Sequence, residues 1–269
     1  MTNQPPTLDE LDSLLESKHG LQLKELIDDI YLKPGETLMW SGSWVEGFAN
    51  SRSDVDLYLL GDVEGRPGKP ELTAPGLPNM RMALSSGQVR LDITVVPREV
   101  VSGVGALLAA FDGDLGYPTQ WSPDLREFIH RLKIGVPVLQ PEVLEAQRDL
   151  IDFDKFTSYL RRFYHNRADS LLEDVIGLLD EGDAISAVLV ARQRLAAVVD
   201  LYLATHGETN TRVDKWRWKK LNRLHHREHP LLQRYLEAER IGSAGSGAEP
   251  RGACEAILVF ADDLLLQTL

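Results

Sequence analysis

The sequence predicts an α+β fold, with a small mixed β-sheet in the first half of the chain and helices throughout the second. Residues 89–95 alternate between apolar and polar side chains, which is typical of a strand with one buried face. Residues 55–60, VDLYLL, form a short apolar run of the kind found in buried strands. Beyond residue 150, apolar residues recur at helical spacing over long stretches.

The first half contains turn signals that separate its elements. Residues 7–32 have helical spacing with a break at Gly20, and KPGE at 33–36 predicts a turn. Four prolines and three glycines within 62–79 indicate a long exposed loop. The remaining expected elements are a strand at 37–43, a short helix at 44–50, a strand at 54–61, a hairpin at 80–97, and helices near 100–111 and 122–135.

The second half is expected to be all-helical. Amphipathic stretches cover 153–180, 183–206 and 213–239, and a last helix is expected at 254–268 after a flexible glycine-rich segment at 242–253. We therefore predict two domains, one with the mixed sheet at 1–145 and a helical one at 146–269.

Composition narrows the class of protein. The single cysteine, Cys254, rules out an internal disulfide, which fits a reducing, cytoplasmic location. The N-terminus lacks a basic region followed by an apolar stretch, so no signal peptide is expected. Apolar runs stay below the ~18 residues that a membrane span needs.

The charge is acidic and unevenly distributed. Residues 1–150 hold 13 Lys and Arg against 23 Asp and Glu, which accounts for −10 of the net charge of −12. An acidic chain is a poor general binder of nucleic acid, because phosphate binding depends on Lys and Arg. It suits a cationic small molecule or a metal-bound nucleotide. A solvated acidic surface would give the same count.

Three aspartates are candidates for a metal site. Asp54 and Asp56 stand two residues apart on a predicted strand, so their carboxylates share one face. Asp92 lies on the polar face of another predicted strand, and the three converge if these strands are neighbours. Hard carboxylate oxygens suit Mg²⁺ together with substrate phosphates. Two such ions could clamp the attacking and leaving oxygens of an in-line displacement.

Gly42 and Ser43 precede the aspartates and are candidates for phosphate binding. Glycine lets the backbone approach a phosphate closely, and a following helix would present free N–H groups. The structural alternative is an ordinary turn and helix cap.

The segment GSWVEGFANSRSDVDLYLL resembles the signature of the DNA polymerase β-like nucleotidyltransferase superfamily, and VRLDITVVP is similar to the strand that carries its third carboxylate. The resemblance implies Mg²⁺-dependent transfer of a nucleoside monophosphate from a nucleoside triphosphate with release of pyrophosphate. It implies that Gly42 and Ser43 hold the phosphates and that Asp54 and Asp56 bind the metals. Asp92 would bind the second metal or act as general base.

The second half resembles the helical domain of small-molecule nucleotidyltransferases of the aminoglycoside-modifying kind. The resemblance rests on Lys215, Trp216, Lys219 and Leu221. It implies that Lys219, or its neighbour Lys220, reaches the triphosphate; the alternative is a solvated helix face. It leaves open whether one chain or a homodimer completes the active site.

These observations favour an enzyme that transfers AMP from ATP to a hydroxyl of a small, aminoglycoside-like acceptor. One alternative is adenylylation of a protein partner by an antitoxin-like enzyme. Another is a sensor that binds nucleotide without turnover.

Overall fold

The computed structural model describes residues 5–28, 30–64, 66, 69–73, 77–86, 89–113, 121–210, 214–225, 228–241 and 249–268, with the backbone alone for 69–73 and 77–86. The chain divides into two compact units. The sheet unit comprises Met1–Phe111 and Trp121–Phe153, and the helical unit comprises Asp112–Gln120 and Asp154–Leu269.

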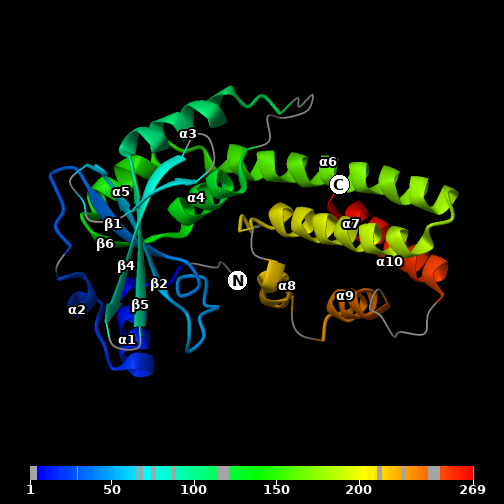
Figure 1. The fold of residues 1–269 in the computed structure, drawn as a ribbon, viewed down its shortest axis with the longest axis horizontal. Coiled ribbons are helices and arrows are strands. Elements are labelled where there is room, and N and C mark those ends of the chain that lie inside the picture. Colours follow the sequence, from blue (N-terminus) through cyan, green and yellow to red (C-terminus); the bar gives the residue numbers. More distant parts are fainter. Residues whose placement is uncertain are drawn as a thin grey trace. The chain divides into compact units, whose positions relative to one another are not determined.

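The α+β class is confirmed (Figure 1). The elements of the sheet unit are α1 (Leu8–His19), α2 (Leu23–Ile27), β1 (Thr37–Ser41), β2 (Val55–Leu60), β3 (Lys69–Thr73), β4 (Leu77–Ser86), β5 (Val89–Val96), α3 (Arg98–Ala110), α4 (Pro123–Ile134), β6 (Val136–Leu139) and α5 (Pro141–Arg148). The expected break at Gly20 is confirmed, because Gly20 ends α1 in the left-handed conformation with φ 67°.

The sheet has six strands in the order β3-β4-β5-β2-β1-β6. Strands β2 and β5 pair in parallel, and the other neighbours pair antiparallel, so the sheet is mixed as predicted. The alternation in β2 and β5 is also confirmed: Val55, Leu57, Leu91 and Ile93 are buried. These side chains join one core with the apolar residues of α1 and α2, which therefore cover that face of the sheet. The candidate site lies on the opposite, polar face of the sheet.

Two expectations for the sheet were wrong. The segment 62–79, expected to be a loop, contains β3 and the start of β4, which pair with Pro70 opposite Met80. A proline is tolerated in β3 because this is an edge strand, where a missing N–H leaves no neighbour unsatisfied. Strand β6 was not expected, because four residues directly after α4 are too few to show a period; it pairs with β1.

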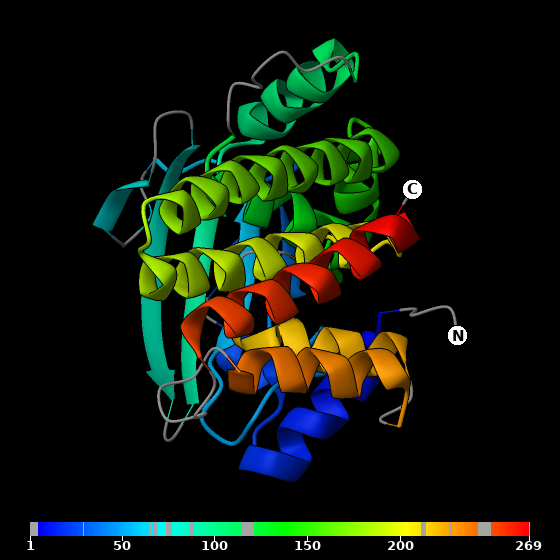
Figure 2. The ribbon, with the colours of Figure 1, turned by 90° about the vertical axis from the view of Figure 1, so that its right-hand side faces the viewer.

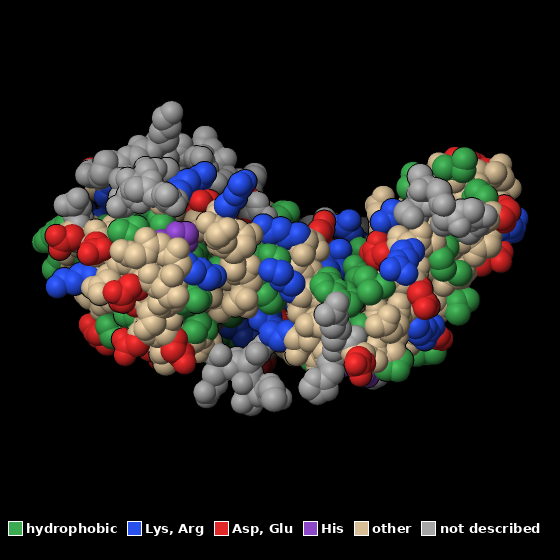
Figure 3. All heavy atoms as spheres, turned by 90° about the horizontal axis from the view of Figure 1, so that it is seen from below, with side chains coloured by type: hydrophobic (Ala, Val, Ile, Leu, Met, Phe, Trp, Pro, Cys, Tyr) green, Lys and Arg blue, Asp and Glu red, His purple; other side chains and the backbone are tan. Residues whose placement is uncertain are grey.

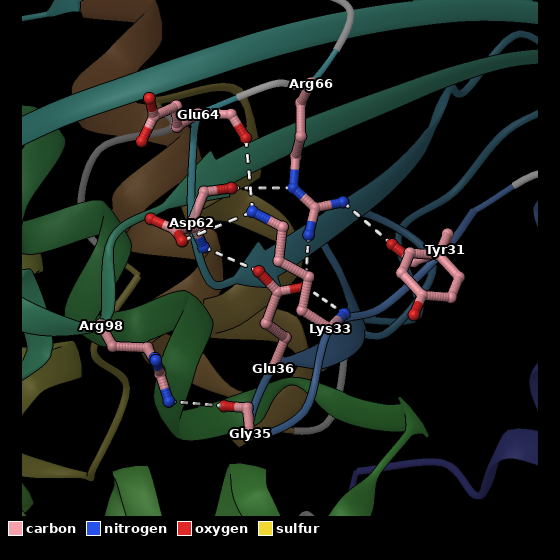
Figure 4. Close-up of polar contacts among 8 residues, drawn as sticks. All are labelled: Tyr31, Lys33, Gly35, Glu36, Asp62, Glu64, Arg66 and Arg98. Carbon is pink, nitrogen blue, oxygen red and sulfur yellow. Dashed lines mark hydrogen bonds and ion pairs between the residues drawn. The ribbon is translucent and has the colours of Figure 1, made fainter.

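A buried carboxylate fastens the loop before β1 to the loop after β2 (Figure 4). Glu36 is 1% exposed and accepts hydrogen bonds from the backbone N–H of Lys33 at 2.7 Å and of Asp62 at 2.8 Å. The guanidinium of Arg66 pairs with it and also donates to the backbone oxygens of Asp62 and Tyr31. Burial acts to raise the pKa of Glu36, but these bonds outweigh it and lower the pKa below its usual value.

We expect Glu36→Gln to lower the free energy of unfolding by about 3 kcal/mol, because it leaves a buried guanidinium without its counter-charge. The melting temperature should fall by roughly 6–12 °C. Because the folded pKa of Glu36 is lowered, its stabilisation is complete above its unfolded pKa and is lost as pH falls through the folded one. The difference in melting temperature between the wild type and Glu36→Gln should therefore shrink in acid. Glu64→Gln, an exposed change in the same loop, is the control, and equal melting of both variants would contradict the prediction.

The helical unit is built around a buried helix. Its elements are α6 (Phe153–Asp180), α7 (Ala184–Thr205), η1 (Asp214–Trp216), α8 (Arg217–Leu224), α9 (Pro230–Ile241), α10 (Pro250–Leu265) and η2 (Leu266–Thr268). Helix α7 buries residues on several faces and packs along α10, as Figures 1 and 2 both show. The predicted helix over 213–239 is divided into η1, α8 and α9, and α10 begins at Pro250 rather than 254; residues 242–248 lie outside the described residues. None of the described helices combines the length and apolarity that a membrane crossing requires.

Candidate functional site

Three neighbouring strands place polar residues side by side on the face of the sheet opposite α1 and α2. The register pairs Ser41 of β1 with Asp56 of β2, and Asp56 with Asp92 of β5. Residues directly opposite each other in adjacent strands point to the same face. The parallel pairing of β2 with β5 thus makes neighbours of two aspartates that are far apart in the sequence.

Asp54 lies one residue before β2, where the turn that follows β1 is held against it. The indole Nε1 of Trp44 donates to the backbone oxygen of Asp54 at 3.0 Å. Asp54, Asp56 and Asp92 keep 40%, 32% and 26% of their side chains exposed, so all three are accessible to a ligand.

Arg90 lies two residues before Asp92 on the same face of β5 and forms a two-pronged pair with it. Its Nε and Nη2 donate to the two carboxylate oxygens of Asp92 at 2.8 and 2.7 Å. Its Nε is also 4.0 Å from Asp54 Oδ2. The bonds to Asp92 raise the pKa of Arg90, so this cation links two of the three aspartates.

Helix α4 contributes a second arginine that sequence reasoning missed. Ser122 caps the helix, its hydroxyl accepting from the N–H of Leu125 at 3.1 Å, and Pro123 follows at the first helical position. On this helix, Glu127 accepts from Arg131 Nη2 at 2.9 Å, and Arg131 Nη1 lies 3.6 Å from Asp56 Oδ2. The only signal in the sequence was the i, i+4 spacing of Glu127 and Arg131.

Gly42 brings the backbone against these charges. It has φ 81°, and a Cβ on it would lie 2.0 Å from Asp56 Oδ2 and 2.4 Å from Arg131 Nη1. Only glycine fits, because a side chain would be strained by the backbone and would collide with both groups. Ser43 follows, half-buried.

The expected short helix at 44–50 was wrong. Residues 42–47 form consecutive turns, with the N–H of Glu46 bonded to the oxygen of Gly42 and that of Phe48 to the oxygen of Ser43. The left-handed conformations of Gly42 and Gly47 prevent a regular helix. A helix dipole therefore plays no part at this turn.

A buried pair holds this turn against α4. His130 Nε2 and Glu46 Oε1 are 2.8 Å apart, and both side chains are at least 96% buried. Arg131 directly follows His130 in the helix. The pair therefore also holds the backbone that carries the Arg131 guanidinium near Gly42. Neither residue of the pair was predicted.

The cluster carries a surplus of negative charge. Four carboxylates, those of Asp54, Asp56, Asp92 and Glu127, face two guanidinium groups, which leaves a formal charge of −2. Burial raises the pKa of Asp56; Arg131 opposes this shift, and the neighbouring carboxylates add to it. Burial would lower the pKa of Arg131, but Tyr58 and Asp56 outweigh it and raise the pKa, so Arg131 keeps its charge.

The donor set fits a divalent cation. Within the described ranges, no group of three or more His, Cys, Asp or Glu side chains is already arranged around a point that could hold a metal. In this structure the aspartates are instead paired with arginines, since a guanidinium nitrogen lies within 4.0 Å of each of the three carboxylates. The oxygens are hard, and the surplus of −2 matches one divalent ion, which would also relieve the repulsion felt by Asp56.

Lys219 lies on α8 in the helical unit and is exposed, whereas Lys220 is 2% exposed and faces inward. Helix α8 is tied to α7 by Arg217, which donates to both carboxylate oxygens of Asp200 at 2.9 and 2.8 Å. Burial raises the pKa of Asp200, against the effect of Arg217.

No protein-family model matches the chain, and no curated protein matches it. A solved structure that the chain resembles is described as a nucleotidyltransferase-like protein from Exiguobacterium sibiricum 255-15. The two share 12% identity over 97% of this chain and 75% of the other, with a TM-score of 0.44. A likeness of this size does not establish a common fold, so any assignment of function rests on the residues of the site itself.

Proposed function

We propose that the sheet unit catalyses Mg²⁺-dependent transfer of a nucleoside monophosphate from a nucleoside triphosphate to a hydroxyl group. The observation that carries the proposal is the register that aligns Ser41, Asp56 and Asp92 on adjacent strands, with Asp56 close against the backbone of Gly42. Carboxylates next to a close-approach glycine suit a metal-bound phosphate chain.

Asp54, Asp56 and Asp92 would hold Mg²⁺, as two ions when the triphosphate is present. Bound there, the ions would neutralise charge on the phosphates and make the acceptor hydroxyl more acidic. The fit rests on the surplus of negative charge in the cluster and on the exposure of its carboxylates.

The phosphate chain would lie against Gly42 and Ser43, where the missing Cβ of Gly42 lets Asp56 and Arg131 come close to the backbone. Most of the rate would come from positioning and from stabilising charge, which phosphoryl transfer depends on.

Asp92 would accept the proton of the attacking hydroxyl. The acceptor oxygen then forms a bond to the α-phosphorus, and the bond to the bridging oxygen breaks, releasing pyrophosphate. For this step Asp92 would have to release its two bonds with Arg90, so that a carboxylate oxygen could accept the hydroxyl proton.

ATP is the proposed nucleotide, and a small aminoglycoside-like molecule the proposed acceptor. Support for a cationic acceptor comes from the acidic balance of residues 1–150. Figure 3 shows Lys and Arg side chains lying among Asp and Glu on the face in that view, so the balance alone does not mark the binding surface.

The test uses each of the common nucleoside triphosphates labelled at the α-phosphate, with Mg²⁺, an aminoglycoside panel and a cell extract. We expect label from ATP in a small cationic product, with an equal amount of pyrophosphate. Label in a protein band would move the proposal to adenylylation of a partner. Calorimetric binding of Mg²⁺–ATP without pyrophosphate release from any mixture would favour a non-catalytic sensor. Sedimentation with and without nucleotide would establish whether a homodimer forms.

A further inference from the structure

The guanidinium of Arg131 is buried and only partly used. Its side chain is 9% exposed, and Glu127 Oε1 accepts from both its Nε, at 3.3 Å, and its Nη2, at 2.9 Å. Its Nη1 is buried and has no hydrogen-bond partner among the described residues. A buried charged donor without an acceptor is unfavourable, and native structures hold such groups mainly where a ligand or water completes them.

The unused nitrogen faces the backbone at Gly42. The position that a Cβ on Gly42 would take is 2.4 Å from Arg131 Nη1 and 2.0 Å from Asp56 Oδ2, so both groups lie directly against the Gly42 backbone. Asp56 Oδ2 is 3.6 Å from Nη1, too far for a hydrogen bond, although its charge still attracts the guanidinium.

We propose that Arg131 is a catalytic residue whose Nη1 donates to an oxygen of the phosphoryl group lying against Gly42. The proposal rests on the proposed function, since it names a further residue of that same site. A guanidinium suits this task because its planar, permanently charged fork can keep one edge on a carboxylate and present the other to phosphate.

The surroundings of Arg131 hold it in this orientation. Glu127 fixes the edge with Nε and Nη2, so Nη1 is the nitrogen left to turn toward the ligand. The buried pair of Glu46 and His130 fastens the helix that carries Arg131 to the turn that carries Gly42. Glu127, Glu46 and His130 are therefore positioning residues.

The test measures binding of inorganic tripolyphosphate in the presence of Mg²⁺ by calorimetry, and pyrophosphate release from ATP. The variants are Arg131→Gln, Arg131→Lys and Glu127→Gln. Lys24→Gln is the control: Lys24 is exposed on α2, and its substitution removes the same charge from the sheet unit. Arg131→Gln should weaken tripolyphosphate binding at least about 10-fold and lower kcat about 100-fold. Arg131→Lys should also lose about 10-fold in affinity, because one ammonium cannot bridge Glu127 and the phosphate.

A purely structural ion pair with Asp56 gives a different result. Arg131→Lys would then bind tripolyphosphate as the wild type does, and Arg131→Gln would change only the melting temperature; this outcome would overturn the proposal while leaving the transferase intact. A wild-type protein that neither binds Mg²⁺–tripolyphosphate nor releases pyrophosphate would overturn the proposed function, and the role of Arg131 with it.

Discussion

Asp56→Asn is expected to lower the rate of pyrophosphate release by about three orders of magnitude, since several kcal/mol of metal-borne charge stabilisation would be lost. Asp56, a proposed metal ligand, lies between Ser41 and Asp92 in the register. An amide oxygen carries no full charge, so it binds Mg²⁺ far less well than a carboxylate does. Steady-state assays of pyrophosphate over a range of Mg²⁺ concentrations would measure the loss.

The same substitution is expected to leave the protein at least as stable as the wild type. The raised pKa of Asp56 means that the folded protein disfavours its charged form, and asparagine removes that charge. Thermal melting would therefore separate loss of chemistry from loss of fold. Asp62→Asn is the matched control: Asp62 lies just beyond the other end of β2, is 64% exposed, and should keep full activity. Wild-type turnover in Asp56→Asn would contradict the proposed mechanism.

Gly42→Ala is expected to reduce activity about 100-fold, because a displacement of about 1 Å at a reacting group is enough for such a loss. The new Cβ would be placed 2.0 Å from Asp56 Oδ2, so the carboxylate or the turn has to move. The left-handed backbone should cost a further ~1–2 kcal/mol of folding free energy. Activity and thermal melting of the same preparation measure both effects.

Gly47→Ala supplies the control for this experiment. Gly47 has φ 72°, close to that of Gly42, but no described atom lies within 4 Å of the Cβ position. It should show the loss of stability without the loss of activity. If both variants remained active, Gly42 would serve only as a turn residue.

Alternation with a period of two residues was sufficient to predict the polar faces of β2 and β5, and with them Asp54, Asp56 and Asp92 as candidates. Their adjacency could not be predicted, because it depends on β5 pairing in parallel with β2 across an intervening hairpin. The local sequence indicates which side chains of a strand share a face, but not which other strand will pair with it.

The residues missed in the site come from elements that pack on the sheet. Arg131 and Glu127 are placed by the docking of α4, and a helical period does not reveal which sheet position its polar residues will meet. Arg90 could have been found, since it shares the polar face of β5 with Asp92. The helix expected after Ser43 does not form. Its helical propensity gave no sign of the positive φ that Gly42 and Gly47 adopt.

The parallel pairing of β2 with β5 also bears on how the chain acquires its site during folding. The β1–β2 and β4–β5 pairs join neighbouring segments, whereas Asp56 meets Asp92 only after the chain between them has closed a long loop. Contacts across such a separation carry a larger entropic cost and tend to form late. A partly folded chain, including one still emerging from the ribosome, would hold its local hairpins before it holds the aligned carboxylates.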